Sequence, residues 1–162
     1  SMTIPRIAQL TQKTNQFNMT TRRYTEEEIM RMMQSNQYLV VSLRAKDKFG
    51  DNGTVGVAIV EKGNSTWRID TFLLSCRVIG RRIEETLLVY LSQVAKKAGA
   101  VQLIGEFIST GKNNPAKGFY GKNSFVLRET IDDKEMWEYD VEHNEHSFLD
   151  FIHAILPEND VW

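Results

Sequence analysis

The 162-residue chain has a single cysteine and no hydrophobic run long enough to span a membrane. One cysteine excludes an intramolecular disulfide and a cysteine-rich zinc site, and it fits a reducing cytoplasm. No signal peptide, internal repeat or low-complexity tract is visible, and the content of 41% hydrophobic and 25% charged residues is that of an ordinary globular chain. We therefore expect a cytoplasmic protein without a metal site, a membrane or a nucleic acid partner.

The chain is long enough for one domain with its own core. Ser1 before Met2 is typical of a cleaved tag, so we expect residues 1–5 to be a tag scar and leader and residues 6–162 to be a single domain.

A net charge of −1 conceals an uneven distribution of charge. Basic residues dominate from 77 to 122, where Arg77, Arg81, Arg82, Lys96, Lys97, Lys112, Lys117 and Lys122 stand against Glu84, Glu85 and Glu106. From residue 128 onward the acids dominate. A basic middle suits an anionic ligand or an acidic partner protein, and a solvated helix face followed by an acidic tail explains it equally well.

Residues 66–98 contain the most informative pattern. Trp67, Ile69 and Thr71 alternate before an apolar run and predict a strand over residues 66–76, while residues 83–98 carry one apolar stripe at helical spacing. A strand that turns tightly into a helix directs free backbone N–H groups toward one place, which suits a phosphate. Cys76 lies at the edge of that place.

The remaining pattern predicts an α/β (α+β) fold. Further strands are expected at residues 17–21, 38–45, 54–60, 101–107, 124–129 and 136–141, and helices at 25–33, 114–120 and 146–156, with a short helix or connector at 6–15. Asn52-Gly53 predicts the hairpin turn between two of these strands. This order of elements predicts a mixed sheet with helices on both faces, and a ligand crevice at the C-terminal ends of strands 66–76 and 101–107.

This arrangement resembles the GNAT acyltransferases, whose mixed, mostly antiparallel sheet is flanked by helices and splays between its fourth and fifth strands. Their Gln/Arg-x-x-Gly-x-Gly/Ala motif, which cradles the pyrophosphate of coenzyme A, is similar to residues 77–82 (Arg-Val-Ile-Gly-Arg-Arg), except that Arg82 replaces the last small residue. A second similar element is Asn114 followed by residues 119–125 (Phe-Tyr-Gly-Lys-Asn-Ser-Phe).

Longer strings resemble one narrower family, the FkbH-like proteins. They are residues 6–18, 20–24, 47–53 and 69–81. Those proteins join a HAD-type phosphatase domain to a GNAT-like domain and load a glyceryl unit onto an acyl carrier protein in polyketide pathways. No two aspartates here are two residues apart, so the Asp-x-Asp of a HAD domain is absent. The resemblance thus implies an excised domain or a stand-alone relative.

The resemblance also implies roles for individual residues. Cys76 would hold the glyceryl group as a thioester before its transfer to the phosphopantetheine thiol of the carrier, and cationic neighbours favour the reactive thiolate. The implied cofactor-binding residues, for phosphopantetheine or coenzyme A, are Arg77, Gly80, Arg81, Arg82 and Asn114. Tyr120 would protonate a departing thiolate.

Each of these residues also has a purely structural interpretation. Cys76 could be a small buried hydrophobic residue, Asn114 an ordinary helix N-cap, and Tyr120 an aromatic side chain packed on the sheet. Asp70 could line the crevice or face solvent. Glu106 could be a general base or have no role.

The expected function is therefore acyl transfer through Cys76 to an acyl carrier protein. One alternative is an N-acetyltransferase that uses acetyl-coenzyme A, with Glu106 or water as the base and Tyr120 as the acid. The other is a non-catalytic module that only binds a carrier protein.

Overall fold

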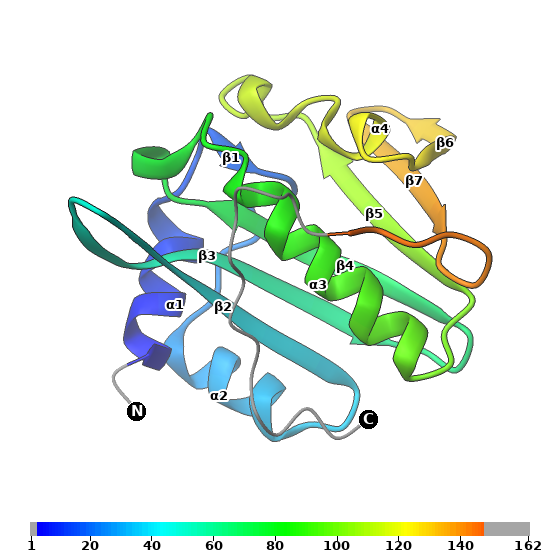
Figure 1. Ribbon diagram of the computed structural model, residues 1–162, viewed down its shortest axis with the longest axis horizontal. Helices are drawn as coiled ribbons and strands as arrows, with labels where there is room; N and C mark the ends of the chain where they lie inside the picture. The colour runs from blue at the N-terminus through cyan, green and yellow to red at the C-terminus, as the bar shows by residue number, and fades with distance from the viewer. Residues whose placement is uncertain (1–2, 148–162) are drawn as a thin grey trace.

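The computed structural model describes residues 3–147 and consists of one sheet between helices (Figure 1). The helices are α1 (Thr3–Lys13), α2 (Glu26–Gln34), α3 (Ile83–Lys97) and α4 (Phe119–Lys122), with 3-10 turns η1 (Cys76–Val78) and η2 (Asn114–Ala116). The strands are β1 (Phe17–Asn18), β2 (Tyr38–Asp47), β3 (Gly50–Lys62), β4 (Thr66–Leu74), β5 (Gln102–Ile108), β6 (Val126–Ile131) and β7 (Lys134–Asp140). The helix expected from residue 146 falls, from residue 148 on, outside the described residues.

The sheet confirms the predicted α+β class. Its strand order is β2-β3-β4-β5-β7-β6, with β1 paired to β4. Neighbouring strands run antiparallel except β4 and β5, which are parallel. A parallel pair needs a crossover, and α3 provides it as the sequence pattern predicted.

Helices cover both faces of the sheet because the side chains of a strand alternate between the faces (Figure 1). On one face, buried residues of α3 such as Leu87 and Leu91 belong to the same apolar cluster as Phe72. On the other, residues of α1 and α2 belong to a second cluster with Leu73. The predicted capping box is present at the start of α2, where the Glu28 N–H donates to the Thr25 hydroxyl at 3.1 Å.

The predicted hairpin between strands 38–45 and 54–60 is present, but its turn does not lie at Asn52-Gly53. Asp47 pairs with Gly50, so the chain reverses at residues 48–49. Gly53 has a φ of +69° and lies beside a register shift in the β2–β3 ladder. A glycine in this left-handed region is typical of a β-bulge, and here it twists the hairpin without ending it.

The strands β4 and β5 diverge after a short paired section. Their register covers Thr66–Ile69 against Gln102–Gly105 only. Beyond that point β1 pairs with the last residues of β4, Asn18 opposite Leu73 and Phe17 opposite Leu74. The predicted divergence of these two strands is therefore present, and the first strand of the chain lies against β4 within it.

Candidate functional site

The only cysteine lies at the C-terminal end of β4, where the chain leaves the sheet. β4 ends at Leu74, and Ser75 caps the 3-10 turn η1 by accepting a long hydrogen bond from the Arg77 N–H at 3.5 Å. Cys76 is the first residue of this turn and is exposed. The interpretation of Cys76 as a buried hydrophobic residue is therefore wrong.

The arginines of the turn are engaged by the neighbouring chain. Arg77 donates to the backbone carbonyl of Asn52 at 3.2 Å, and Arg81 forms an ion pair with Asp47 at 3.1 Å. Both partners belong to the β2–β3 hairpin, so these two contacts connect the hairpin to the turn that contains Cys76.

Two acidic residues, Glu84 and Glu85, lie in the first turn of α3. Arg82 has a left-handed φ of 62° and pairs with Glu85 at 3.1 Å. Burial raises the pKa of the neighbouring Glu84 carboxyl, and its Oε2 atom has no hydrogen-bond partner in the described part of the chain. Acids in the first helical turn interact with the same dipole that a phosphate would use. Gly80, with a φ of +88°, gives the turn the left-handed residue it needs.

The divergence between β4 and β5 is occupied by residues that follow α1. The Met19 N–H donates to the Phe72 carbonyl of β4 at 3.0 Å, and the Met19 carbonyl accepts from the Ile108 N–H of β5 at 2.8 Å. Asn113 adds a side-chain amide that donates to the Asn18 carbonyl at 2.9 Å. The predicted crevice at the C-terminal strand ends is thus filled by the chain itself.

Glu106 of β5 lies in a cluster of charged side chains and is 1% exposed. Its carboxylate pairs with Arg22 at 3.1 Å, with Lys134 at 2.8 Å, and with Arg68. Burial alone would raise the pKa of this carboxyl, but the hydrogen bonds from the three cations outweigh burial and lower the pKa to about 2. A carboxylate held in this way is a poor proton acceptor at neutral pH, which disfavours its role as a general base.

Asp70 belongs to the same cluster. It is 6% exposed, so it does not face solvent, and its carboxylate pairs with Arg22 at 3.1 Å. It also accepts a hydrogen bond from the Tyr24 hydroxyl at 2.6 Å. Arg22 therefore links the two buried acids of β4 and β5.

Tyr120 is enclosed in the aromatic core. Its ring lies against Gly105, where an added Cβ would come within 2.6 Å of it, and its neighbours include Phe72 and Phe125. The residue is 1% exposed, and its hydroxyl has no hydrogen-bond partner among residues 3–147. Burial raises the pKa of this phenol. The packing interpretation therefore fits Tyr120 better than the role of general acid.

Solved structures of three acetyltransferases resemble this architecture. The ribosomal-protein-S18-alanine N-acetyltransferase of Escherichia coli has a TM-score of 0.66 at 14% identity, covering 94% of this chain and 95% of its own. The PaiA N-acetyltransferase of Thermoplasma acidophilum, solved with coenzyme A, has a TM-score of 0.60 at 19% identity, covering 72% of each chain. An acetyltransferase of the GNAT family from Desulfovibrio desulfuricans has a TM-score of 0.60 at 16% identity, covering 72% of this chain and 78% of its own.

The chain has the GNAT fold. Identities this low establish the fold alone. No protein-family model matches the sequence, and no curated protein sequence matches it either. The FkbH-like resemblance and the activity therefore remain proposals.

The GNAT fold implies coenzyme A as a cofactor, and the residues between β4 and β5 do not fit it. An extended ligand bound between two strands needs unpaired backbone groups on at least one strand edge. Here the edge of β4 is paired with β1, and Met19 bridges from Phe72 of β4 to Ile108 of β5. In the turn before α3, Arg82 replaces the small residue of the GNAT motif. Coenzyme A bound in this gap therefore has no part in the chemistry proposed below.

The asparagine singled out by its GNAT-like position is not the one that the fold uses. Asn114 is exposed and begins η2, so it is not the N-cap residue. The preceding Asn113 is fully buried, donates to the Asn18 and Ile108 carbonyls, and accepts from the Thr110 N–H. Sequence reasoning missed Asn113 and Arg22. The signal that pointed to a partner such as Arg22 was the pair of acids, Asp70 and Glu106, within expected core strands.

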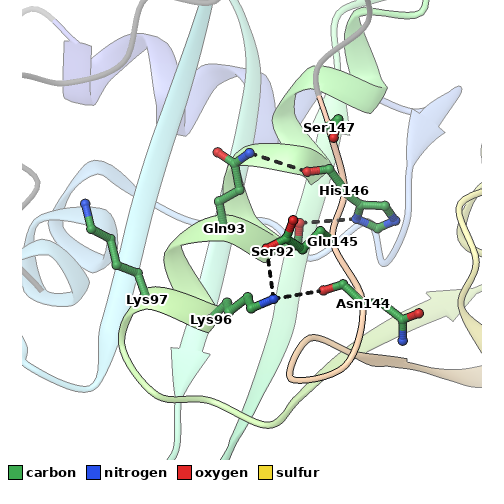
Figure 2. Close-up of a pocket in the computed structure, with 8 residues that line it drawn as sticks. All are labelled: Ser92, Gln93, Lys96, Lys97, Asn144, Glu145, His146 and Ser147. Carbon is green, nitrogen blue, oxygen red and sulfur yellow. Dashed lines mark hydrogen bonds and ion pairs between the residues drawn. The ribbon is translucent and has the colours of Figure 1, made fainter.

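A cavity of about 370 Å³ lies beside the C-terminal half of α3 (Figure 2). It is lined by Lys96 and by residues 144–147. His146 contacts the Ser92 hydroxyl at 3.2 Å and the Asn123 carbonyl at 2.9 Å. Because a carbonyl only accepts, Nε2 of His146 carries a proton, and burial lowers the pKa of this ring. Within residues 3–147, neither His143 nor His146 has Cys76 as a hydrogen-bond partner.

Two further classes of site are absent from residues 3–147. No helix there is long and apolar enough to cross a membrane. No group of three or more His, Cys, Asp or Glu side chains within this range is placed to hold a metal ion.

Replacing Tyr120 with phenylalanine is expected to leave the free energy of unfolding unchanged or to raise it by up to about 1 kcal/mol, because the change removes a buried hydroxyl without a partner. Urea unfolding monitored by circular dichroism measures this difference. A loss of acyl-transfer rate without a loss of stability would instead support the general-acid role.

Proposed function

We propose that this chain is an acyltransferase in which Cys76 accepts an acyl group from a thioester and passes it to a phosphopantetheine thiol. The observation that supports this proposal is the exposed thiol of Cys76, just after the C-terminal end of β4. A thiolate is the side-chain nucleophile best matched to thioester exchange.

Each half of the proposed exchange breaks one thioester C–S bond and forms another. The Cys76 thiolate attacks the thioester carbonyl, a new S–C bond forms, and the donor leaves as a thiolate that takes up a proton. In the second half the acceptor thiol loses its proton, attacks the acyl-cysteine and restores the Cys76 thiolate. Neither half requires an oxidant, a reductant or a metal.

An acyl carrier protein is the partner that we propose for this exchange. Arg77 and Lys117 are exposed, and neither forms an ion pair with a described residue. Arg77 donates only to the neutral Asn52 carbonyl among the described residues, so the positive charge of both side chains can face an acidic surface. A glyceryl group is the acyl unit implied by the FkbH-like resemblance, and a HAD-type phosphatase domain would be a further partner.

Intact-protein mass spectrometry tests the proposal. The chain is mixed with glyceryl-loaded carrier protein or with the glyceryl thioester of N-acetylcysteamine. We expect a mass increase of one acyl group, mapped to the peptide that contains Cys76 and released by hydroxylamine. Added salt should slow acylation by the carrier but not by the small thioester, because only the carrier depends on charge complementarity. No adduct with an intact donor would instead support the binding-module alternative.

A coenzyme A-dependent N-acetyltransferase is the second candidate. The observation that favours it is the fold, which the chain shares with N-acetyltransferases of known structure. This candidate predicts acetylation of an amine acceptor that does not require Cys76. Transfer of radiolabelled acetate from acetyl-coenzyme A to a panel of amines and peptides separates the two candidates.

A further inference from the structure

We infer that residues 17–22, here called the gap segment, are the permanent occupant of the space between β4 and β5, and that the chain does not bind coenzyme A in that space. This space begins where β4 and β5 cease to pair, after Ile69 and Gly105. The inference goes beyond the proposed function, since it holds whether or not Cys76 carries an acyl group.

The gap segment pairs with the backbone edge of β4. Asn18 and Phe17 continue the ladder opposite Leu73 and Leu74. The carbonyls of Phe72 and Asp70 are both used as acceptors, the first by the Met19 N–H. The second accepts from the Thr20 hydroxyl at 2.8 Å and from Arg22 at 3.0 Å. An incoming chain would have to break these bonds before it could form its own.

The gap segment is also bonded on the β5 side. Its Met19 carbonyl accepts from the Ile108 N–H, and its Asn18 carbonyl accepts from the fully buried Asn113 amide. The Asn18 side chain connects residues on both sides of it in the sequence. Its amide nitrogen donates to the Thr14 carbonyl at 3.1 Å, and its Oδ1 atom accepts from the Thr21 N–H at 2.9 Å. The gap segment is therefore held like an additional strand inserted between β4 and β5.

The space beneath the backbone is filled as well. Phe17 is 3% exposed and Met19 is 1% exposed. The Phe17 ring packs edge-on against Phe119 at a centroid distance of 5.3 Å and lies 6.4 Å from Phe72. Buried aromatic rings therefore pack closely around the point where the strands part, where the thiol end of a ligand would lie.

Arg22 locks the end of the gap segment. Its guanidinium joins Asp70 of β4 to Glu106 of β5 across the divergence, at 3.1 Å in each case. Moving the segment aside would leave these two buried acids with fewer cations, and the loss of a partner from a buried ion pair is strongly unfavourable. An ion pair that bridges both strands thus opposes the opening that a coenzyme would need.

Hydrogen exchange with and without coenzyme A tests the inference on the intact chain. The two reporters are the amides of Met19 and Ile108, which bond across the gap. We expect both to exchange as slowly as the core strands, and neither to change in about 1 mM coenzyme A or acetyl-coenzyme A, at which the melting temperature should also stay constant. A saturable rise in melting temperature with altered exchange at Met19 and Ile108 would overturn the inference. A rise without such a change would place the coenzyme outside the gap and uphold it.

Arg22→Ala provides the perturbation. Arg31→Ala is the matched control on α2, because Arg31 is exposed and pairs with Glu27. We expect Arg22→Ala to speed exchange at Met19 and Ile108 by at least about tenfold and the control to leave it unchanged, because Arg22 pairs with the buried Asp70 and Glu106 whereas Arg31 pairs with an exposed acid. Equal exchange in the two variants would show that Arg22 does not lock the segment. If Arg22→Ala does not fold, the wild-type exchange experiment alone decides. None of these readouts depends on acyl transfer, so failure of the proposed function would not be mistaken for failure of this inference.

Discussion

Replacing Cys76 with serine is expected to abolish acyl-enzyme formation and to leave folding stability within about 0.5 kcal/mol of the wild type. The thiol is exposed and the substitution replaces sulfur with oxygen, so no buried contact is removed. Acyl transfer should stop because the variant lacks an active nucleophile: a serine hydroxyl without an adjacent base is not activated. Intact mass spectrometry after incubation with the carrier thioester measures the first effect, and a urea titration measures the second.

Alkylation of the wild type offers an independent control. The chain has one thiol, so iodoacetamide should add one group and block acylation to the same extent as Cys76→Ser. Amine acetylation that survives both treatments would support the N-acetyltransferase candidate. A serine variant that still becomes acylated at another residue would refute the role of Cys76.

Replacing Glu106 with glutamine is expected to lower the free energy of unfolding by about 3 kcal/mol at neutral pH, because three cations would then surround a neutral amide. The Glu106 carboxyl has a pKa of about 2 in the folded chain, against 4.5 ordinarily. A pKa lowered by folding means that ionisation stabilises the folded state. The wild-type advantage should therefore be complete above about pH 4.5 and decline as the pH falls toward 2.

Chemical denaturation of both proteins across this pH range measures the difference. Glu27→Gln is the matched control: Glu27 forms one exposed helical ion pair, and its loss should change stability by less than about 0.5 kcal/mol. If Glu106→Gln were as stable as the wild type but lost transfer activity, the general-base role of Glu106 would be favoured over the structural one.

Much of the fold could be predicted because its signals are local. The apolar stripe of residues 83–98, the capping box at Thr25 and the alternation in residues 66–76 each depend on neighbours within a few positions, and the structure has α3, α2 and β4 there. The hairpin itself was predicted, but the position of its turn was not, because an Asn-Gly pair is as common in a bulge as in a turn. The two-residue reversal at residues 48–49 uses Lys and Phe, which carry no strong turn signal.

The site could be predicted only in part. The sequence placed Cys76, Gly80 and the arginines together, and the structure keeps them on one turn. It could not show that Arg77 and Arg81 are held by the hairpin, or that residues 17–22 enter the divergence of β4 and β5, because those contacts join segments distant in sequence. Local patterns carry no information about such pairings.

The position of β1 has a consequence for the order in which the molecule assembles. Residues 17–22 leave the ribosome early, yet their partners on β4 and β5 are made much later. Until β5 is present, the segment has only one of its two neighbours, and loop closure over such separations slows folding. We therefore expect residues 17–22 to complete the sheet after β4 and β5 have formed. A chain truncated before β5 should leave both the segment and the edge of β4 open to association.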